Sequence, residues 1–133
     1  MLGAFLVAAG TAHLTSLRTE FRAQVPPWVP LDVDLVVVAS GVVELLVGAA
    51  LLLTLLPGRP ARARVGAGLV AAGLFVAVFP GNVAQYVEGR DAFGLDTDQA
   101  RLVRLFFQPL LVAWALWCTG AAGWLITRLR SRR

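Results

Sequence analysis

The sequence predicts an all-α membrane protein, an antiparallel bundle of four transmembrane helices. Of the 133 residues, 58% are hydrophobic, whereas ordinary soluble domains contain about 45–50% apolar residues. Charged residues make up only 15% of the chain and cluster between long apolar runs. Roughly 20 consecutive apolar residues are enough to cross a bilayer as a helix. We therefore expect a single transmembrane domain over residues 1–133.

Four apolar runs predict the four spans. They cover residues 2–17, 33–56, 65–87 and 102–127. Each run is rich in Leu, Val and Ala with interspersed Gly, which is typical of helices that pack closely in lipid. The first run has no positively charged segment before it, so we interpret it as a span and not as a cleaved signal peptide.

The distribution of charge predicts the orientation of the spans. All twelve basic residues are Arg, and the net charge is +4. Residues 57–64 contain three Arg and residues 128–133 contain four, and neither segment contains an acid. Because cytoplasmic loops are enriched in basic residues, we expect both termini and the second connection in the cytoplasm. Since the Arg residues flank the spans, they fit a lipid bilayer and not a nucleic-acid partner.

The connection after the first run is rich in proline. Residues 25–30 read Val-Pro-Pro-Trp-Val-Pro, and three prolines exclude an ordinary helix interior. Trp28 favours the headgroup level of a membrane. This outer loop connects the first two helices. It is either an interfacial linker or a rigid lid over the outer mouth of the bundle.

Glu44 lies in the middle of the second apolar run. An ionisable side chain at this depth is costly, and such residues are usually functional or paired. A carboxylate there requires protonation, a nearby cation or several hydrogen bonds. His13 and Arg104 are the candidate partners on other spans.

Polar side chains from all four spans are predicted to gather in the outer half of the membrane. Ser40 and Glu44 share one helix face because they are four residues apart. The candidate ligand-binding residues are His13, Ser40, Glu44, Asn82, Gln85, Tyr86, Arg104 and Gln108. Pro80 and Pro109 lie at a similar depth and favour a widened cavity. Alternatively, the amides form hydrogen bonds between helices and Arg104 extends to the interface.

Other site chemistries fit the sequence poorly. His13 and Glu44 are too few ligands to predict a metal site. No nucleophile motif and no phosphate-binding glycine loop is present, so we predict no catalytic residue. The single cysteine, Cys118, excludes an intrachain disulfide. A redox role would therefore need a bound cofactor or the thiols of a partner protein.

Short motifs along the chain resemble those of the DoxX-like family of small four-helix membrane proteins. They are the residues 10–13 (Gly-Thr-Ala-His), 25–30, 40–44 (Ser-Gly-Val-Val-Glu), 78–82 (Val-Phe-Pro-Gly-Asn), 101–102 and 108–110 (Gln-Pro-Leu). Leu14 departs from the aromatic residue that is common in the family, and Phe106-Phe107 replaces the usual Pro-Leu. The resemblance implies a multi-pass protein of the bacterial plasma membrane. It also implies that His13, Glu44, Asn82 and Gln108 occupy the polar positions of the family.

Three functions are consistent with this pattern. The first is a binding protein whose outer pocket takes a quinone, a lipid or another apolar molecule with a polar head. The second, implied by the resemblance, is a membrane subunit of a quinone-linked oxidoreductase or a redox-stress complex. The third is an assembly or scaffold factor for a membrane partner protein. Quinone is the one cofactor that the pattern suggests, and whether the chain catalyses a reaction stays open.

Overall fold

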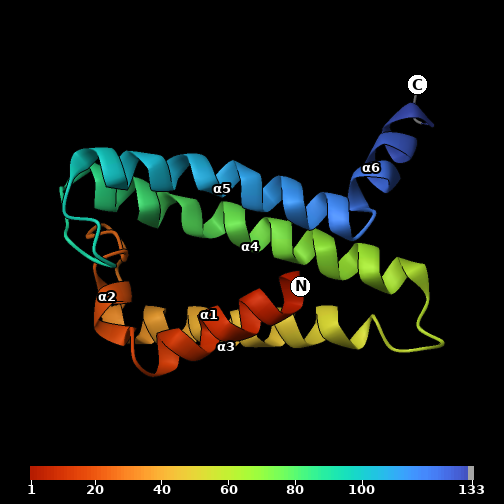
Figure 1. The fold of residues 1–133 in the computed structure, drawn as a ribbon, viewed down its shortest axis with the longest axis horizontal. Helices are drawn as coiled ribbons and strands as arrows, with labels where there is room; N and C mark the ends of the chain where they lie inside the picture. The colour runs from red at the N-terminus through yellow and green to blue at the C-terminus, as the bar shows by residue number, and fades with distance from the viewer. Residues whose placement is uncertain (132–133) are drawn as a thin grey trace.

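The computed structural model describes residues 1–131, and over this range the chain folds into six helices without strands (Figure 1). The helices are α1 (Leu2–Leu14), α2 (Arg18–Arg22), α3 (Val33–Leu53), α4 (Ala61–Val87), α5 (Asp98–Cys118) and α6 (Ala121–Arg130). The prediction of an all-α fold is confirmed. By length and composition, α3, α4 and α5 are each able to cross a membrane. Arg132 and Arg133 of the predicted basic tail lie outside the described residues.

Helix α1 is shorter than the span predicted over residues 2–17. It ends at Leu14 because the backbone N–H groups of Thr15 and Leu17 both bond the carbonyl of Ala12, which closes the last turn. Its 13 residues extend about 20 Å at about 1.5 Å per residue. The hydrocarbon core of a bilayer is about 30 Å thick, so α1 is too short to cross it alone.

Three other helix ends also differ from the predicted runs. Helix α3 ends at Leu53 and not at residue 56. Directly after its end, the Thr54 hydroxyl donates a hydrogen bond to the Leu51 carbonyl. Helix α4 begins at Ala61 and not at residue 65, directly after Pro60, because proline is well placed beside the first helical turn. Helix α5 begins at Asp98 and not at residue 102, because the Thr97 hydroxyl accepts a hydrogen bond from the Ala100 N–H.

Helices α1 and α3 form one closely packed pair (Figure 1). Gly3 lies opposite Gly48, and Gly10 lies opposite Gly41, so the two helices run in opposite directions. A Cβ atom placed on Gly10 would lie 2.6 Å from the Gly41 carbonyl oxygen. Only glycine permits backbones to approach this closely.

Helices α4 and α5 form the second pair, and α3 and α4 are joined by residues 54–60 (Figure 1). The two pairs contact each other less than the helices within each pair do. A hydrophobic core joins them away from the α2 end. It consists of Leu2, Leu6, Val47, Leu51, Ala71, Ala72, Phe75 and Ala115. The pairs diverge beyond this core, and the candidate site lies where they diverge.

The predicted fourth span, residues 102–127, is divided into two helices. Gly120 has a φ of 76°, a left-handed conformation that commonly ends a helix and favours glycine. Helix α6 therefore leaves the direction of α5 at a clear angle (Figure 1). This break was not predictable from the apolar run, because membrane helices also contain glycine in continuous runs.

Helix α2 and the proline-rich segment lie at the end of the molecule opposite the α3–α4 connection (Figure 1). Arg22 forms a two-pronged hydrogen-bonded ion pair with Asp34, at 2.7 Å and 2.5 Å. This hydrogen bond raises the pKa of Arg22 above its ordinary value. Val25 and Pro26 are buried, whereas Trp28 is exposed. The segment thus rests on the helix pairs through its first residues.

Candidate functional site

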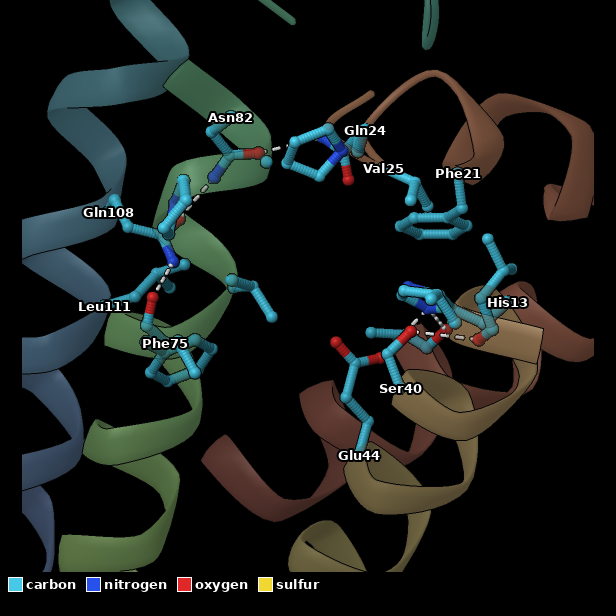
Figure 2. A pocket seen from close by; sticks show the side chains of 18 of the residues that line it. His13, Phe21, Gln24, Val25, Ser40, Glu44, Phe75, Asn82, Gln108 and Leu111 are labelled. Atoms are coloured by element: carbon cyan, nitrogen blue, oxygen red, sulfur yellow. Dashed lines mark hydrogen bonds and ion pairs between the residues drawn. The ribbon is translucent and has the colours of Figure 1, made fainter. Parts of the chain in front are cut away.

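A cavity of about 360 Å³ lies between the two helix pairs. His13, Ser40 and Glu44 line the α1–α3 wall, and Asn82, Arg104 and Gln108 line the α4–α5 wall. Residues 24–26 and 28–29 cover the end near α2. Figure 2 shows the labelled polar groups of the two walls on opposite sides of an open space. Six of the eight candidate residues therefore share one cavity.

Glu44 and His13 meet on the α1–α3 wall. Both side chains are buried, and the His13 Nδ1 atom lies 3.0 Å from Glu44 Oε2. The same Nδ1 atom lies 3.0 Å from the Ala9 carbonyl oxygen, with which it is aligned for a hydrogen bond. The pair is close enough for ionic attraction but is not aligned as a hydrogen bond. Glu44 Oε2 is consequently buried without a hydrogen-bond partner among residues 1–131.

Ser40 does not relieve this shortage. Its hydroxyl donates to the Val37 carbonyl of its own helix at 2.9 Å. Serine often bonds the preceding turn of a helix in this way. Ser40 thus lines the cavity one turn from Glu44 without bonding the carboxylate.

The polar groups of the opposite wall are connected to each other. Asn82 Nδ2 donates to Gln108 Oε1 at 2.8 Å, and Gln108 Nε2 donates to the Phe75 carbonyl at 2.5 Å. Asn82, Gln108 and Phe75 are all buried, and Figure 2 shows this chain of bonds from α4 to α5. Pro109 follows Gln108 inside α5. The two side-chain amides therefore share one hydrogen bond, and the Gln108 amide donates a second one to a backbone carbonyl.

Gln24 connects the covering segment to this network. Its amide nitrogen lies 2.9 Å from Asn82 Oδ1 and 3.1 Å from Gln85 Oε1. With the amide turned over, its oxygen accepts from Arg104 Nη2 at 2.6 Å instead. Gly81 also lies against the Gln24 carbonyl, where a Cβ atom would collide. Glycine at this position lets the covering segment contact α4 directly.

Arg104 extends into the cavity mouth and not away from the bundle. Its guanidinium lies 4.5 Å from the centre of the Phe93 ring, and Nε is 3.4 Å from Asn82 Oδ1. Phe93 contacts Phe21 edge to face, and Phe21 stacks on His13. Within residues 1–131, Arg104 forms no ion pair with a carboxylate. The cation and the Glu44 carboxylate thus lie on opposite walls without touching.

Two candidate residues lie outside the cavity lining. Gln85 is almost completely buried and bonds Gln24 and the Arg90 carbonyl, at 3.1 Å and 3.4 Å. Its place is behind Asn82, where it supports the network. Tyr86 is half-buried and does not line the cavity. Of the three residues predicted to share a face of helix α4, only Asn82 lines the cavity, and Gln85 and Tyr86 do not.

The covering segment is also held by the α4–α5 connection. Arg90 Nη1 donates to the carbonyls of Ala23 and Val25, at 3.2 Å and 3.0 Å. The Phe93 N–H donates to the Glu20 carboxylate at 2.5 Å. These bonds fix residues 20–25 over the cavity. The positions of Phe21, Gln24 and Phe93 were not predicted from the sequence, because connections lack the periodicity that orients helical side chains.

No group of three or more potential metal ligands lies together within the described residues 1–131. The chemistry of the cavity is instead that of hydrogen bonding at one end and apolar contact elsewhere. Phe5, Leu6, Phe75 and Leu111 line its apolar part. Pockets that combine an apolar lining with a few polar groups are typical of small-molecule sites.

Residues 2–119 match the family model described as a domain of unknown function, DUF8561. The chain belongs to this family. No curated protein and no solved structure matches it. The match covers α1 to α5 and ends one residue before Gly120, so both walls of the cavity and the segment that covers it belong to the DUF8561 region. Helix α6 lies outside the match.

Proposed function

We propose that this DUF8561 protein is a multi-pass membrane protein that binds an apolar small molecule by its polar head. The observation that carries the proposal is Glu44 Oε2, buried at the cavity without a hydrogen-bond partner among residues 1–131. An unsatisfied buried carboxylate oxygen costs about 1–3 kcal/mol or more. A ligand that donates a hydrogen bond to this atom would remove that cost, and its binding affinity would gain accordingly.

The proposed membrane arrangement has four segments, with α1 as a short first segment and α3, α4 and α5 as full spans. Arg59, Arg62 and Arg64 lie at or next to the start of α4, far from the cavity, and α6 carries Arg128 and Arg130 at the same end of the molecule. Because basic residues favour the cytoplasmic side, both termini face the cytoplasm and the cavity lies in the outer half of the membrane. A bacterial plasma membrane and membership of the wider DoxX-like group are part of this proposal.

A ligand can reach the cavity from the lipid. Ala77 and Pro80 line it from α4 and Trp28 lines it from the covering segment, and all three are exposed. These three residues form part of the exposed rim of the cavity. A quinone or a lipid could place its apolar part among lipid chains and its head between the two walls.

The test is native mass spectrometry of gently purified protein, together with extraction of bound lipids and quinones. We expect one co-purifying compound in the wild type, and its loss in Glu44→Gln. Asp96→Asn is the matched control, because Asp96 is an exposed acid outside the cavity. If wild type and Glu44→Gln are equally folded and neither carries a compound, the binding function is wrong. The role of a scaffold for a membrane partner would then be the better explanation.

A further inference from the structure

We infer that the cavity takes the head group of an aminophospholipid, with the phosphate at Arg104 and the ammonium group at Glu44. The inference rests on the proposed binding function and adds the chemical class of the ligand. It starts from the charges of the cavity. Arg104 is the cation of the α4–α5 wall, Glu44 is the acid of the α1–α3 wall, and no ion pair joins them.

The Glu44 end lacks a donor. The hydrogen on His13 Nδ1 bonds the Ala9 carbonyl, and the Ser40 hydroxyl bonds the Val37 carbonyl. Neither neighbour therefore donates to Glu44 Oε2. A primary ammonium has three N–H donors and a positive charge, so it satisfies both the hydrogen-bonding and the electrostatic needs of this carboxylate.

The Arg104 end lacks an anion. The guanidinium is half-buried and rests on the Phe93 ring. Its nearest polar contacts are the neutral amides of Asn82 and Gln24. Guanidinium groups bind phosphate strongly because their planar N–H groups match two phosphate oxygens. With its oxygen toward Arg104, the Gln24 amide accepts from Nη2 at 2.6 Å. This acceptor is neutral, so the guanidinium charge stays uncompensated in the cavity.

The volume of the cavity fits a head group and not a whole lipid. About 360 Å³ lies near the lower end of the roughly 300–1,000 Å³ that small-ligand pockets have. A phosphoethanolamine head group fits a space of this size, whereas two long acyl chains do not. The chains must therefore leave past the exposed rim at Ala77 and Pro80, into the surrounding lipid.

A head-group comparison tests the inference on the delipidated full-length protein. The probes are phosphatidylethanolamine, phosphatidylcholine and phosphatidylglycerol with identical acyl chains, titrated in neutral detergent and followed by native mass spectrometry. We expect the ethanolamine lipid to bind about tenfold more tightly than the other two, because only it brings both a phosphate and N–H donors on a cation. Equal binding of the ethanolamine and choline lipids by the wild type would overturn the inference without any variant.

Two variants separate the contributions of the two ends. In Glu44→Gln, the preference for ethanolamine over choline should disappear while the weaker phosphate-dependent binding stays. In Arg104→Gln, binding of all three lipids should fall. The matched controls are Asp96→Asn and Arg59→Gln, whose exposed side chains lie outside the cavity. A preference that persists in folded Glu44→Gln contradicts the placement of the ammonium group.

The same samples distinguish this inference from the proposed function. If an uncharged compound such as a quinone co-purifies and is lost in Glu44→Gln, the cavity is a binding site but the lipid assignment is wrong. If no compound and no added lipid binds, both are wrong. Circular dichroism of each variant verifies that its helices are intact.

Discussion

The two walls of the cavity satisfy their polar groups differently. On the α4–α5 wall, Asn82, Gln108 and the Phe75 carbonyl form a continuous chain of hydrogen bonds. On the α1–α3 wall, Glu44 has only an ionic contact with His13, and one of its oxygens has no hydrogen bond. Polar residues at the same depth therefore have two roles. The amides stabilise the helix pair, whereas the acid is available to a ligand.

The walls also differ in how their helices are joined. Helices α1 and α3 meet through glycines, with backbone against backbone and without a hydrogen bond between side chains of the two helices. The α1–α3 pair is thus stabilised by close packing, and the α4–α5 pair also by its amides. Four substitutions test this contrast, from the largest expected effect to the smallest.

The largest effect is expected at the glycine contact. Gly10→Ala places a methyl group 2.6 Å from the Gly41 carbonyl oxygen, which α1 and α3 can accommodate only by moving apart. Overpacking costs about 1–3 kcal/mol, and we expect the upper end here because the new methyl group would also lie 2.9 Å from the Leu45 backbone nitrogen. The measurement is thermal unfolding in detergent. Gly73→Ala is the control, because open space surrounds Gly73, and equal effects of the two changes would contradict the role of close packing.

A smaller loss is expected in the amide network. Gln108→Leu removes the bonds to Asn82 and the Phe75 carbonyl and leaves both groups buried. The free energy of unfolding should fall by about 2 kcal/mol, because each orphaned buried group costs about 1–3 kcal/mol and part of the loss is offset by the apolar side chain. Gln99→Leu, at an exposed position of α5, is the control. A neutral Gln108→Leu would mean that the amides are not needed for the α4–α5 pair.

Glu44→Gln should change stability least among the cavity residues. The carboxylate has an unsatisfied oxygen in the free protein, so a neutral amide of the same shape should alter the unfolding free energy by less than about 1 kcal/mol. The preference for the ethanolamine head group should be lost at the same time. Stability is measured by the same thermal unfolding after delipidation. A loss as large as that of Gln108→Leu would place Glu44 among the structural residues and remove the contrast between the walls.

The smallest effect is expected outside the cavity. Asp34→Asn removes the ion pairs that Asp34 forms with Arg18 and Arg22. The acid and both arginines have exposed side chains. Surface ion pairs contribute little, so the unfolding temperature should hardly move, and any change should vanish at high salt. A large, salt-independent loss would show that α2 is needed to hold the covering segment in place.

The sequence predicted those helices well whose position follows from the length of an apolar run. The apolar runs located α3, α4 and α5 because a membrane helix needs continuous apolar sequence. It did not predict the break at Gly120, since the left-handed conformation depends on how α5 ends against its neighbours. It also overestimated α1, whose last turn closes at Thr15 through backbone bonds that an apolar run does not encode.

The candidate site was predictable where helical periodicity fixes the direction of a side chain. Residues four apart share one helix face. This places Ser40 beside Glu44, and Arg104 beside Gln108, and all four line the cavity. Tyr86 lies one turn from Asn82 and does not reach it. Gln24 lies in a connection, where the backbone follows no period, and its contact with Asn82 depends on the opposite helix pair. The sequence therefore placed the walls of the cavity and offered residues 25–30 as a possible cover, but it did not place Gln24 against Asn82.

The glycine-lined contact of α1 with α3 has a consequence for the order of assembly. Its two helices are complete once residue 53 has been synthesised, whereas the opposite wall extends from Phe75 to Leu111. During synthesis Glu44 thus meets His13 before Asn82 or Arg104 exists. Until residues 82 and 104 follow, the early pairing of the glycines is what keeps His13 beside the Glu44 carboxylate.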